Sequence, residues 1–285
     1  MIGVTGATGQ FGQIVIGLLK ERMPADQIVA LARDPAKAAA LDLGVEVRPF
    51  DYNDPDQILA GLEGIDSLLL ISGSDIGLRE VQHRNVIFGA MEQNLGRIVY
   101  TSLLRANTSP LGLAQEHLAT ELILGESGIA CTILRNGWYI ENYVDTAISA
   151  LAAGILAGAA GDGRISAAAR ADYAAAAVAV LTGEGHEGAT YELSGDTAFT
   201  LADLAAELSK ISGQQIGYRD MTEADYAEAL ADSGLAAPWP KVLARIDAQI
   251  AEGALYDEGT TLSTLIGRPT TPLGDVLAER LSWTA

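Results

Sequence analysis

The stretch Ile2-Gly3-Val4-Thr5-Gly6-Ala7-Thr8-Gly9-Gln10-Phe11-Gly12 decides the fold. It begins with a short apolar run typical of a buried strand, and the amphipathic segment that follows it is typical of a helix. The glycines at 6, 9 and 12 let the backbone turn sharply and approach a pyrophosphate, whose charge is stabilised at the positive end of a helix. The stretch therefore predicts a dinucleotide site, and a tight strand-to-helix turn without a ligand is the alternative.

The rest of the first half alternates short β-branched or apolar runs with helix-length segments, which is typical of βαβ units on a parallel sheet. We expect a doubly wound α/β (Rossmann) sheet with its ligand crevice at the carboxyl ends of the strands. The expected strands are Ile2–Thr5, Ile28–Ala32, Val45–Arg48, Ser67–Ile71, Arg97–Tyr100 and Cys131–Leu134, and the expected helices are Phe11–Arg22, Pro35–Leu41, Asp54–Leu62, Leu78–Gln93 and Leu113–Glu126.

After Asn142 the rhythm changes to helices with few strands between them. We therefore expect an NADP-binding domain over residues 1–140 and a smaller, helix-rich α/β substrate lobe over residues 141–285, some of whose segments return to the main sheet. The expected elements of this lobe are helices over Asp172–Leu181, Leu201–Ser212, Glu223–Ala231 and Pro240–Ala251, and strands over Thr190–Leu193 and Gln215–Tyr218.

Composition excludes several classes of partner. The 285 residues carry 18 basic and 37 acidic side chains, a net charge of −19, which disfavours nucleic acid and anionic membrane surfaces. No apolar run of about 18 residues predicts a membrane span. One cysteine, Cys131, and three scattered histidines offer neither an internal disulfide nor zinc-ligand spacing, so no metal is expected. The absence of a leader before the first strand favours the cytoplasm.

Arg33, at the end of the second expected strand, predicts the choice of cofactor. An acidic side chain at this point accepts hydrogen bonds from the ribose of NAD, whereas an arginine pairs with the 2′-phosphate of NADP. Asp34 comes one residue late and, before Pro35, is expected to cap the next helix. The sequence therefore favours NADPH over NADH, and an ordinary surface charge is the alternative for Arg33.

Two further strand ends are expected to face the same crevice. Asp51 and Tyr52 follow the third strand, where a carboxylate can accept from an adenine amino group and an aromatic ring can pack against it. Ser72, Gly73 and Ser74 follow the fourth strand, where small residues let a cofactor lie against the backbone. Either of these two strand ends could instead be a simple polar turn.

The fifth and sixth strands end near the place where a nicotinamide ring lies in such folds. Thr101 ends the fifth strand. Asn136 follows the sixth and could hold the nicotinamide carboxamide or cap the turn. His117 and Glu121 lie one helical turn apart on the helix between these strands. We expect His117 to be a nicotinamide-site residue and a proton donor, the alternative being a histidine bonded to a backbone carbonyl or to Glu121.

A set of motifs is spread over nearly the whole chain: Gly6-Ala7-Thr8-Gly9-Gln10, Arg33, Asp51-Tyr52, Gln82-His83-x-Asn85-Val86, Tyr100-Thr101-Ser102-Leu103, Thr108-Ser109-Pro110-Leu111, Glu116-His117, Leu134-Arg135-Asn136-Gly137-Trp138-Tyr139, Gly158-Ala159-Ala160-Gly161-Asp162-Gly163 and Leu265-Ile266-Gly267. Together they resemble the bacterial NAD(P)H:quinone oxidoreductases of type 2, which belong to the NmrA-like branch of the atypical short-chain dehydrogenases. Triphenylmethane reductase of that branch is also similar.

The resemblance implies NADPH binding by the glycine loop, Arg33, the Ser74–Ile76 segment and the Gly137–Asn142 turn, with a quinone entering between the two lobes. Trp138 and Tyr139 could form an aromatic wall there or pack a lobe junction. The full set of predicted cofactor-binding residues is Gly6, Ala7, Thr8, Gly9, Gln10, Phe11, Arg33, Asp51, Tyr52, Ser72, Gly73, Ser74, Asp75, Ile76, Thr101, Asn136, Gly137, Trp138, Tyr139, Ile140, Glu141 and Asn142.

The chain departs from the usual short-chain dehydrogenases in one respect. Their Tyr-x-x-x-Lys pair would fall at Leu113 and His117, and the helix holds no lysine. A conjugated acceptor needs such an acid less, so we expect two-electron reduction of a small-molecule quinone by direct hydride transfer from NADPH, in a monomer or a homodimer. The alternatives are a redox sensor that binds NADP without turnover and a reductase of triphenylmethane dyes or other conjugated acceptors.

Overall fold

The computed structural model describes residues 1–282, which form two compact units. The first unit comprises Met1–Thr108, Gly112–Asn136 and Ala171–Leu193, and the second comprises Ser109–Leu111, Gly137–Arg170 and the residues from Ser194 onward. The chain therefore leaves the first unit after Asn136 and returns to it for one helix and one strand.

The first unit is built on a parallel sheet of seven strands, which confirms the predicted doubly wound fold. The order places the fourth strand beside the first, so the order of the strands reverses between β1 and β4, and such folds have their ligand crevice at this point. In spatial order the strands are β3 (Glu46–Pro49), β2 (Ile28–Ala32), β1 (Ile2–Val4), β4 (Ser67–Leu70), β5 (Arg97–Leu103), β6 (Ala130–Asn136) and β8 (Thr190–Leu193).

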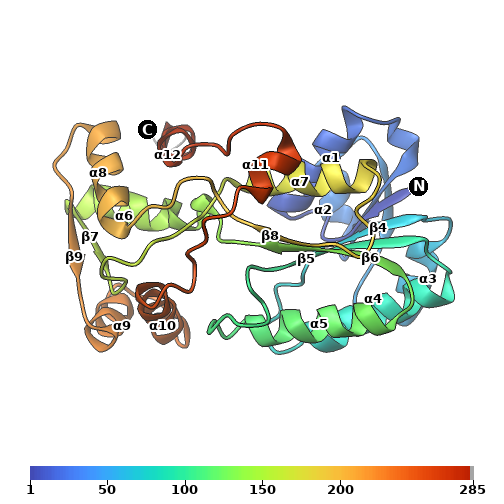
Figure 1. The fold of residues 1–285 in the computed structure, drawn as a ribbon, viewed down its shortest axis with the longest axis horizontal. Coiled ribbons are helices and arrows are strands. Elements are labelled where there is room, and N and C mark those ends of the chain that lie inside the picture. Colours follow the sequence, from blue (N-terminus) through green and yellow to red (C-terminus); the bar gives the residue numbers. More distant parts are fainter. Residues whose placement is uncertain (283–285) are drawn as a thin grey trace. The chain divides into compact units, whose positions relative to one another are not determined.

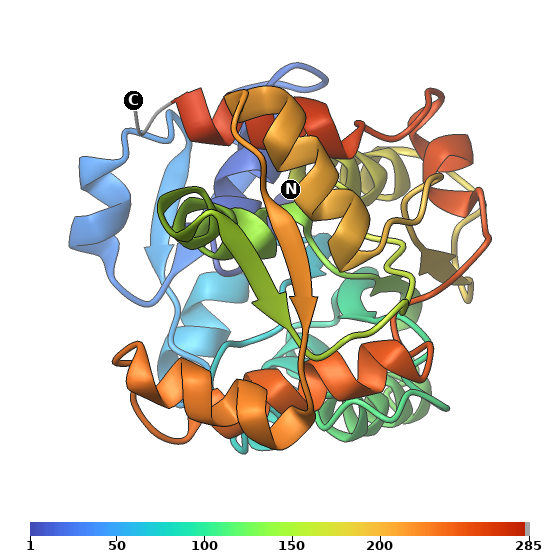
Figure 2. The same cartoon turned by 90° about the vertical axis from the view of Figure 1, so that its left-hand side faces the viewer.

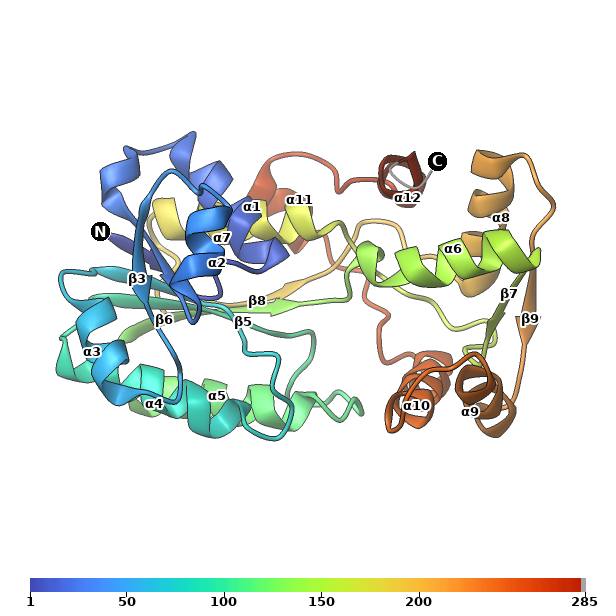
Figure 3. The same cartoon turned by 180° about the vertical axis from the view of Figure 1, so that it is seen from behind.

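Helices cover both faces of this sheet. Figure 1 shows α1 (Gln10–Lys20), α2 (Pro35–Ala40) and α7 (Arg170–Thr182) on one face. Seen from behind in Figure 3, α3 (Pro55–Leu62), α4 (Arg79–Glu92) and α5 (Ala114–Glu126) form the layer on the other face. A short 3₁₀ turn, η1 (Ala25–Gln27), precedes β2. Both faces of the central strands are thus buried, which explains why β1, β2 and β4 are nearly continuous apolar runs.

The second unit holds a small parallel sheet of β7 (Ile155–Gly158) and β9 (Gly217–Asp220), which lie side by side in Figure 2. Helices α9 (Glu223–Asp232) and α10 (Trp239–Ala251) pack closely on each other. The helices of this unit are η2 (Ile140–Tyr143), α6 (Val144–Ala153), α8 (Leu201–Ser212), α9 (Glu223–Asp232), α10 (Trp239–Ala251), α11 (Thr261–Ile266) and α12 (Leu273–Leu281).

Sequence reasoning was less accurate in this second unit. It missed α6, β7, α11 and α12, and it placed β9 two residues too early. The elements that it found have clear end signals. Helix α8 begins with a reciprocal capping box between Thr200 and Asp203 and ends at Gly213, in the left-handed region. Across residues 1–282, no helix combines the length and apolar character needed to cross a membrane.

Candidate cofactor-binding site

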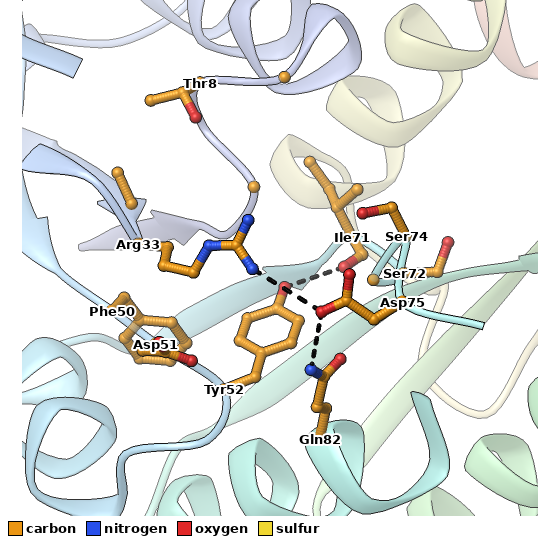
Figure 4. A pocket seen from close by; sticks show the side chains of 14 residues that line it. Thr8, Arg33, Phe50, Asp51, Tyr52, Ile71, Ser72, Ser74, Asp75 and Gln82 are labelled. Carbon is orange, nitrogen blue, oxygen red and sulfur yellow. Dashed lines mark hydrogen bonds and ion pairs between the residues drawn. The ribbon is translucent and has the colours of Figure 1, made fainter. Parts of the chain in front are cut away.

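A cavity of about 290 Å³ lies in the first unit, where β1, β2, β3 and β4 end (Figure 4). These carboxyl ends meet where the order of the strands reverses, and open α/β folds bind their ligands at this point. The cavity is lined by Gly6, Thr8, Gly9, Ala32, Arg33, Phe50, Asp51, Tyr52, Ile71, Ser72, Gly73, Ser74, Asp75 and Gln82.

The glycine loop between β1 and α1 has the conformation that its sequence requires. Gly6 has φ of 57°, in the left-handed region that a side chain disfavours. Gly9 is the N-cap of α1, which therefore begins without a capping side chain. A Cβ on Gly12 would lie 2.5 Å from the carbonyl oxygen of Gly6, so only glycine lets the helix pack this closely on the loop. The helix N-terminus thus faces the end of β1 as an anion site requires.

Arg33 leaves the end of β2 and extends along the cavity. Its side chain is 69% exposed, and its Nη1 lies 3.7 Å from Oδ2 of Asp75, as Figure 4 shows. Asp34 is used elsewhere, because its Oδ1 accepts from the backbone N–H of Lys37 at 3.0 Å. This confirms the prediction that Asp34 caps α2. Arg33 is therefore the charged group that β2 offers to the cavity.

Tyr52 lines the cavity through its ring while its hydroxyl points into the strand ends. The hydroxyl oxygen lies 2.6 Å from Oγ1 of Thr5 and 2.9 Å from the carbonyl oxygen of Ile71. Burial raises the pKa of this phenol above its ordinary value. Asp51 accepts from the backbone and side-chain nitrogens of Asn53 at 2.9 and 3.0 Å. Tyr52 thus joins β1, β3 and β4 beneath the cavity.

The segment that follows β4 is held by three side chains from two other elements, β5 and α4. The N–H of Ser72 donates to Oγ1 of Thr101 at 2.9 Å, and the N–H of Gly73 donates to Nε2 of His83 at 2.9 Å. The carbonyl of Gly73 accepts from Nε of Arg79 at 2.5 Å. Thr101 was predicted to contact the cofactor, and in the structure it supports the segment that lines the cavity.

His117 lies in the interior of the first unit, where it is 5% exposed. Its Nδ1 is 2.8 Å from the hydroxyl of Tyr100, whereas the alternative to a proton donor was a bond to a backbone carbonyl or to Glu121. Burial, with a smaller effect of Arg79, lowers the pKa of His117 to about 3. The imidazole is therefore neutral over the physiological pH range.

Arg135 anchors a charged cluster at the carboxyl ends of β5, β6 and β8. Its Nη2 donates to Oε2 of Glu121 at 2.6 Å, and its Nη1 donates to Oε1 of Glu192 at 2.7 Å. Ser102 donates to Oε1 of Glu121 at 2.5 Å. The β5–β6–β8 register places Ser102 and Glu192 on either side of Arg135, which explains how the guanidinium reaches Glu192, while Glu121 reaches it from α5.

Asn136 follows Arg135 in the chain but, unlike Arg135, its side chain is buried without a hydrogen-bond partner among the described residues. It is 4% exposed, and neither atom of its side-chain amide has a hydrogen-bond partner among the described residues. An unpaired buried amide is costly, so such a group is typical of a site whose partner is a ligand or water. A carboxamide would satisfy its donor and its acceptor together.

The structure brings many of the predicted residues together and leaves others apart. Around the cavity are Gly6, Thr8, Gly9, Arg33, Asp51, Tyr52 and Ser72–Asp75. The cavity lining does not include Ala7, Gln10, Phe11, Ile76, Thr101, Asn136 or His117. Sequence reasoning missed Ala32, Phe50, Ile71 and Gln82; the first three adjoin predicted residues, and Gln82 is one helical turn into α4.

The predicted turn over residues 137–142 belongs to the second unit. Within that unit the Arg170 guanidinium lies 4.9 Å from the centre of the Tyr139 ring, and the Arg170 N–H donates to Glu141 at 3.0 Å. The N–H of Ile140 donates to the carbonyl of Ala168 at 3.0 Å. These contacts order the turn, and its role toward a cofactor stays a prediction.

A family model described as NAD(P)H-binding matches residues 6–184, which include the glycine loop, the cavity and His117. The chain belongs to this NAD(P)H-binding family. It is 53% identical over 280 residues to quinone oxidoreductase 2 of Escherichia coli, with 98% of both chains covered.

Two solved structures of nicotinamide-dependent reductases are similar to this chain over nearly its whole length. An NADPH-dependent quinone oxidoreductase from Escherichia coli, in complex with NADPH, superposes with a TM-score of 0.95 at 52% identity, covering 99% of this chain and all of that one. The triphenylmethane reductase of a Citrobacter species, complexed with NADP(H), has a TM-score of 0.95 at 36% identity, covering 98% of this chain and all of that one.

Proposed function

We propose that the protein is an NADPH-dependent reductase that transfers two electrons to quinones. One observation carries the proposal: the glycine loop and Arg33 meet at one cavity, in a chain 53% identical to quinone oxidoreductase 2. The loop supports a pyrophosphate through backbone N–H groups and the helix dipole. Arg33 supports a 2′-phosphate through its planar fork of donors.

The residues present fit this cofactor at both of its ends. At the adenosine end, Asp34 caps α2 and is not available as the acceptor that favours NAD. At the nicotinamide end, the unpaired amide of Asn136 has the donor and the acceptor that a carboxamide requires. We assign the first unit to cofactor binding and propose that the second unit supplies substrate contacts.

The bound cofactor would supply a hydride to the acceptor. The chain's own contribution is to bind, orient and exclude water, because positioning supplies much of the rate when the acceptor is already electrophilic. His117 is neutral, so its imidazole can take part in a hydrogen bond but does not carry the additional proton that an imidazolium would donate. We propose that water delivers the proton, with His117 and Tyr100 as neutral hydrogen-bonding groups.

A second acceptor class is favoured by one comparison. The triphenylmethane reductase, at 36% identity, shares the fold over nearly the whole chain. Triphenylmethane dyes and quinones are both conjugated electrophiles that accept a hydride, so the same cofactor site could serve either. That the protein works in the cytoplasm, as a monomer or a homodimer, also stays a prediction from the sequence.

The test combines binding and turnover. Isothermal titration should show tight NADPH binding, and steady-state oxidation of NADPH should accelerate when a simple benzoquinone is added. Arg33→Gln should weaken NADPH binding by about 10- to 100-fold, because a charge-assisted contact is lost, while NADH binding changes far less. Arg22→Gln is the matched control, since Arg22 is an exposed arginine of the same unit outside the cavity.

Other outcomes separate the alternatives. Tight NADP binding without oxidation by quinones or by triphenylmethane dyes would favour a redox sensor over an enzyme. Turnover with dyes and not with quinones would change the proposed acceptor from a quinone to a triphenylmethane dye and would leave the cofactor assignment unchanged. No binding of either nicotinamide cofactor would refute the proposal.

A further inference from the structure

Asp75 holds the guanidinium that the cofactor's 2′-phosphate would need. Arg33 and Asp75 come from different strand ends, β2 and β4, and meet across the cavity with Nη1 3.7 Å from Oδ2. Figure 4 shows the two side chains reaching toward each other above the ring of Tyr52. Both residues line the cavity, so the ion pair lies inside the candidate site.

Asp75 is the fixed member of this pair. Its Oδ2 also accepts from Nε2 of Gln82 at 3.0 Å, and Gln82 is 3% exposed on α4. The carbonyl of Asp75 accepts from the N–H of Leu78 at 3.0 Å. The Arg33 side chain is 69% exposed and that of Asp75 is 39% exposed, so the guanidinium is the freer of the two groups to move.

This arrangement makes two anions compete for one cation. A 2′-phosphate that binds Arg33 must draw the guanidinium away from Asp75, and it must also approach the negative charge of Asp75. NADH has a hydroxyl at this position and suffers neither cost. The segment Ser72–Asp75 is held from α4 and β5, so Asp75 cannot easily retreat.

We propose that Asp75 is a specificity-determining residue that lowers the preference for NADPH over NADH by competing for Arg33. The inference rests on the proposed function, because it assumes that this cavity binds the adenosine end of a nicotinamide cofactor. Asp75 acts through Arg33, so it is a positioning residue. Its signature is a change in the ratio of the two cofactor affinities.

The test uses Asp75→Asn, which removes the charge and keeps an oxygen for Gln82. NADPH and NADH are titrated calorimetrically into the whole protein at low ionic strength. We expect the Kd for NADPH to fall by about three- to fivefold, the range set by an exposed ion pair, and the Kd for NADH to change by less. The ratio of the Kd for NADPH to the Kd for NADH should return toward the parent value at high salt, where such charges are screened.

Two further variants make the test specific. With Arg33→Gln in the background, Asp75→Asn should change the ratio by less than it does in the parent protein, because only the direct repulsion between Asp75 and the 2′-phosphate is left to remove. Glu80→Gln removes a carboxylate from the first turn of α4, where Glu80 pairs with Arg84 and lies outside the cavity, and it should leave the ratio unchanged.

The outcomes separate the inference from the function on which it rests. If the parent protein binds NADPH but Asp75→Asn leaves the ratio unchanged or lowers it, Asp75 is not a competitor. An equal shift from Glu80→Gln, or a shift of undiminished size in the Arg33→Gln background, would show that Asp75 does not act through Arg33 and would overturn the inference. If the parent protein binds neither cofactor, the proposed function itself fails.

Discussion

The backbone N–H of Gly73 donates to Nε2 of His83 across 2.9 Å, and this contact determines the charge of the histidine. A ring nitrogen accepts only when it carries no proton, so the proton of His83 is on Nδ1, which lies 2.9 Å from Oγ1 of Thr120. Burial and the nearby charge of Arg79 lower the pKa of His83 to about 4. A neutral histidine thus holds the segment that lines the cavity.

Acid stability should report on this histidine. In the unfolded chain His83 takes up a proton near its ordinary pKa of 6.5, whereas the folded protein resists protonation to about 4. Stability should therefore fall as the pH drops from about 6.5 to 4, by up to about 2 kcal/mol for this residue at pH 5. His83→Gln, which can still accept from Gly73, should have a flatter dependence of the unfolding free energy on pH. Equal slopes for both proteins in urea titrations would contradict this.

The pH dependence of turnover should lack a contribution from His117. Burial lowers its pKa to about 3, so its charge does not change between pH 5.5 and 8.5. If NADPH oxidation by a benzoquinone is followed over this range, His117→Gln should change the rate by the same factor at every pH. A parent rate that falls through an ionisation near neutrality, and loses that ionisation in the variant, would restore His117 as a cationic proton donor.

Two glycines of helix α1 should respond in opposite directions to the same substitution. Gly12→Ala places a methyl group 2.5 Å from the Gly6 carbonyl oxygen and 2.9 Å from Cα of Ala7. Since both are backbone atoms, the loop must shift, and we expect a loss of about 2 kcal/mol or more together with weaker cofactor binding.

Gly17→Ala is the matched control in the same helix. Nothing lies within 4 Å of the added methyl, so the change should stabilise the protein by about 0.5 to 1 kcal/mol. Urea unfolding followed by circular dichroism measures both variants. Equal effects of the two substitutions would mean that the close contact of Gly12 with the loop has no energetic weight.

The Arg135 cluster should contribute far more than an exposed ion pair of the same kind. The side chains of Arg135 and Glu121 are 13% and 10% exposed, so Arg135→Met leaves a buried carboxylate without its partner. We expect a loss of about 3 kcal/mol in unfolding free energy, partly restored when Glu121→Gln is added.

Arg84→Met supplies the comparison. Arg84 pairs with Glu80 one turn away on α4, and both side chains are more than 40% exposed, so its loss should cost less than about 1 kcal/mol. Similar losses in Arg135→Met and Arg84→Met would contradict the view that the β5–β6–β8 cluster is a buried ion pair.

The first unit could be predicted closely because its signals are local. The apolar runs, the glycines at 6, 9 and 12 and the cap at Asp34 each act within a few residues, and the structure has a strand, turn or helix start at each. In the second unit α6 and β7 lie in a run rich in alanine and glycine, where hydrophobic periodicity is weak, so sequence reasoning missed them.

The sequence by itself determined the doubly wound sheet, the position of the glycine loop and the presence of an arginine at the end of the second strand, since each depends on short-range backbone and side-chain chemistry. Only the tertiary structure decided the charge of His117, the partner of Arg33 and the unpaired amide of Asn136. Burial and contacts between distant strand ends set these properties, and they arise only when residues far apart in the chain come together.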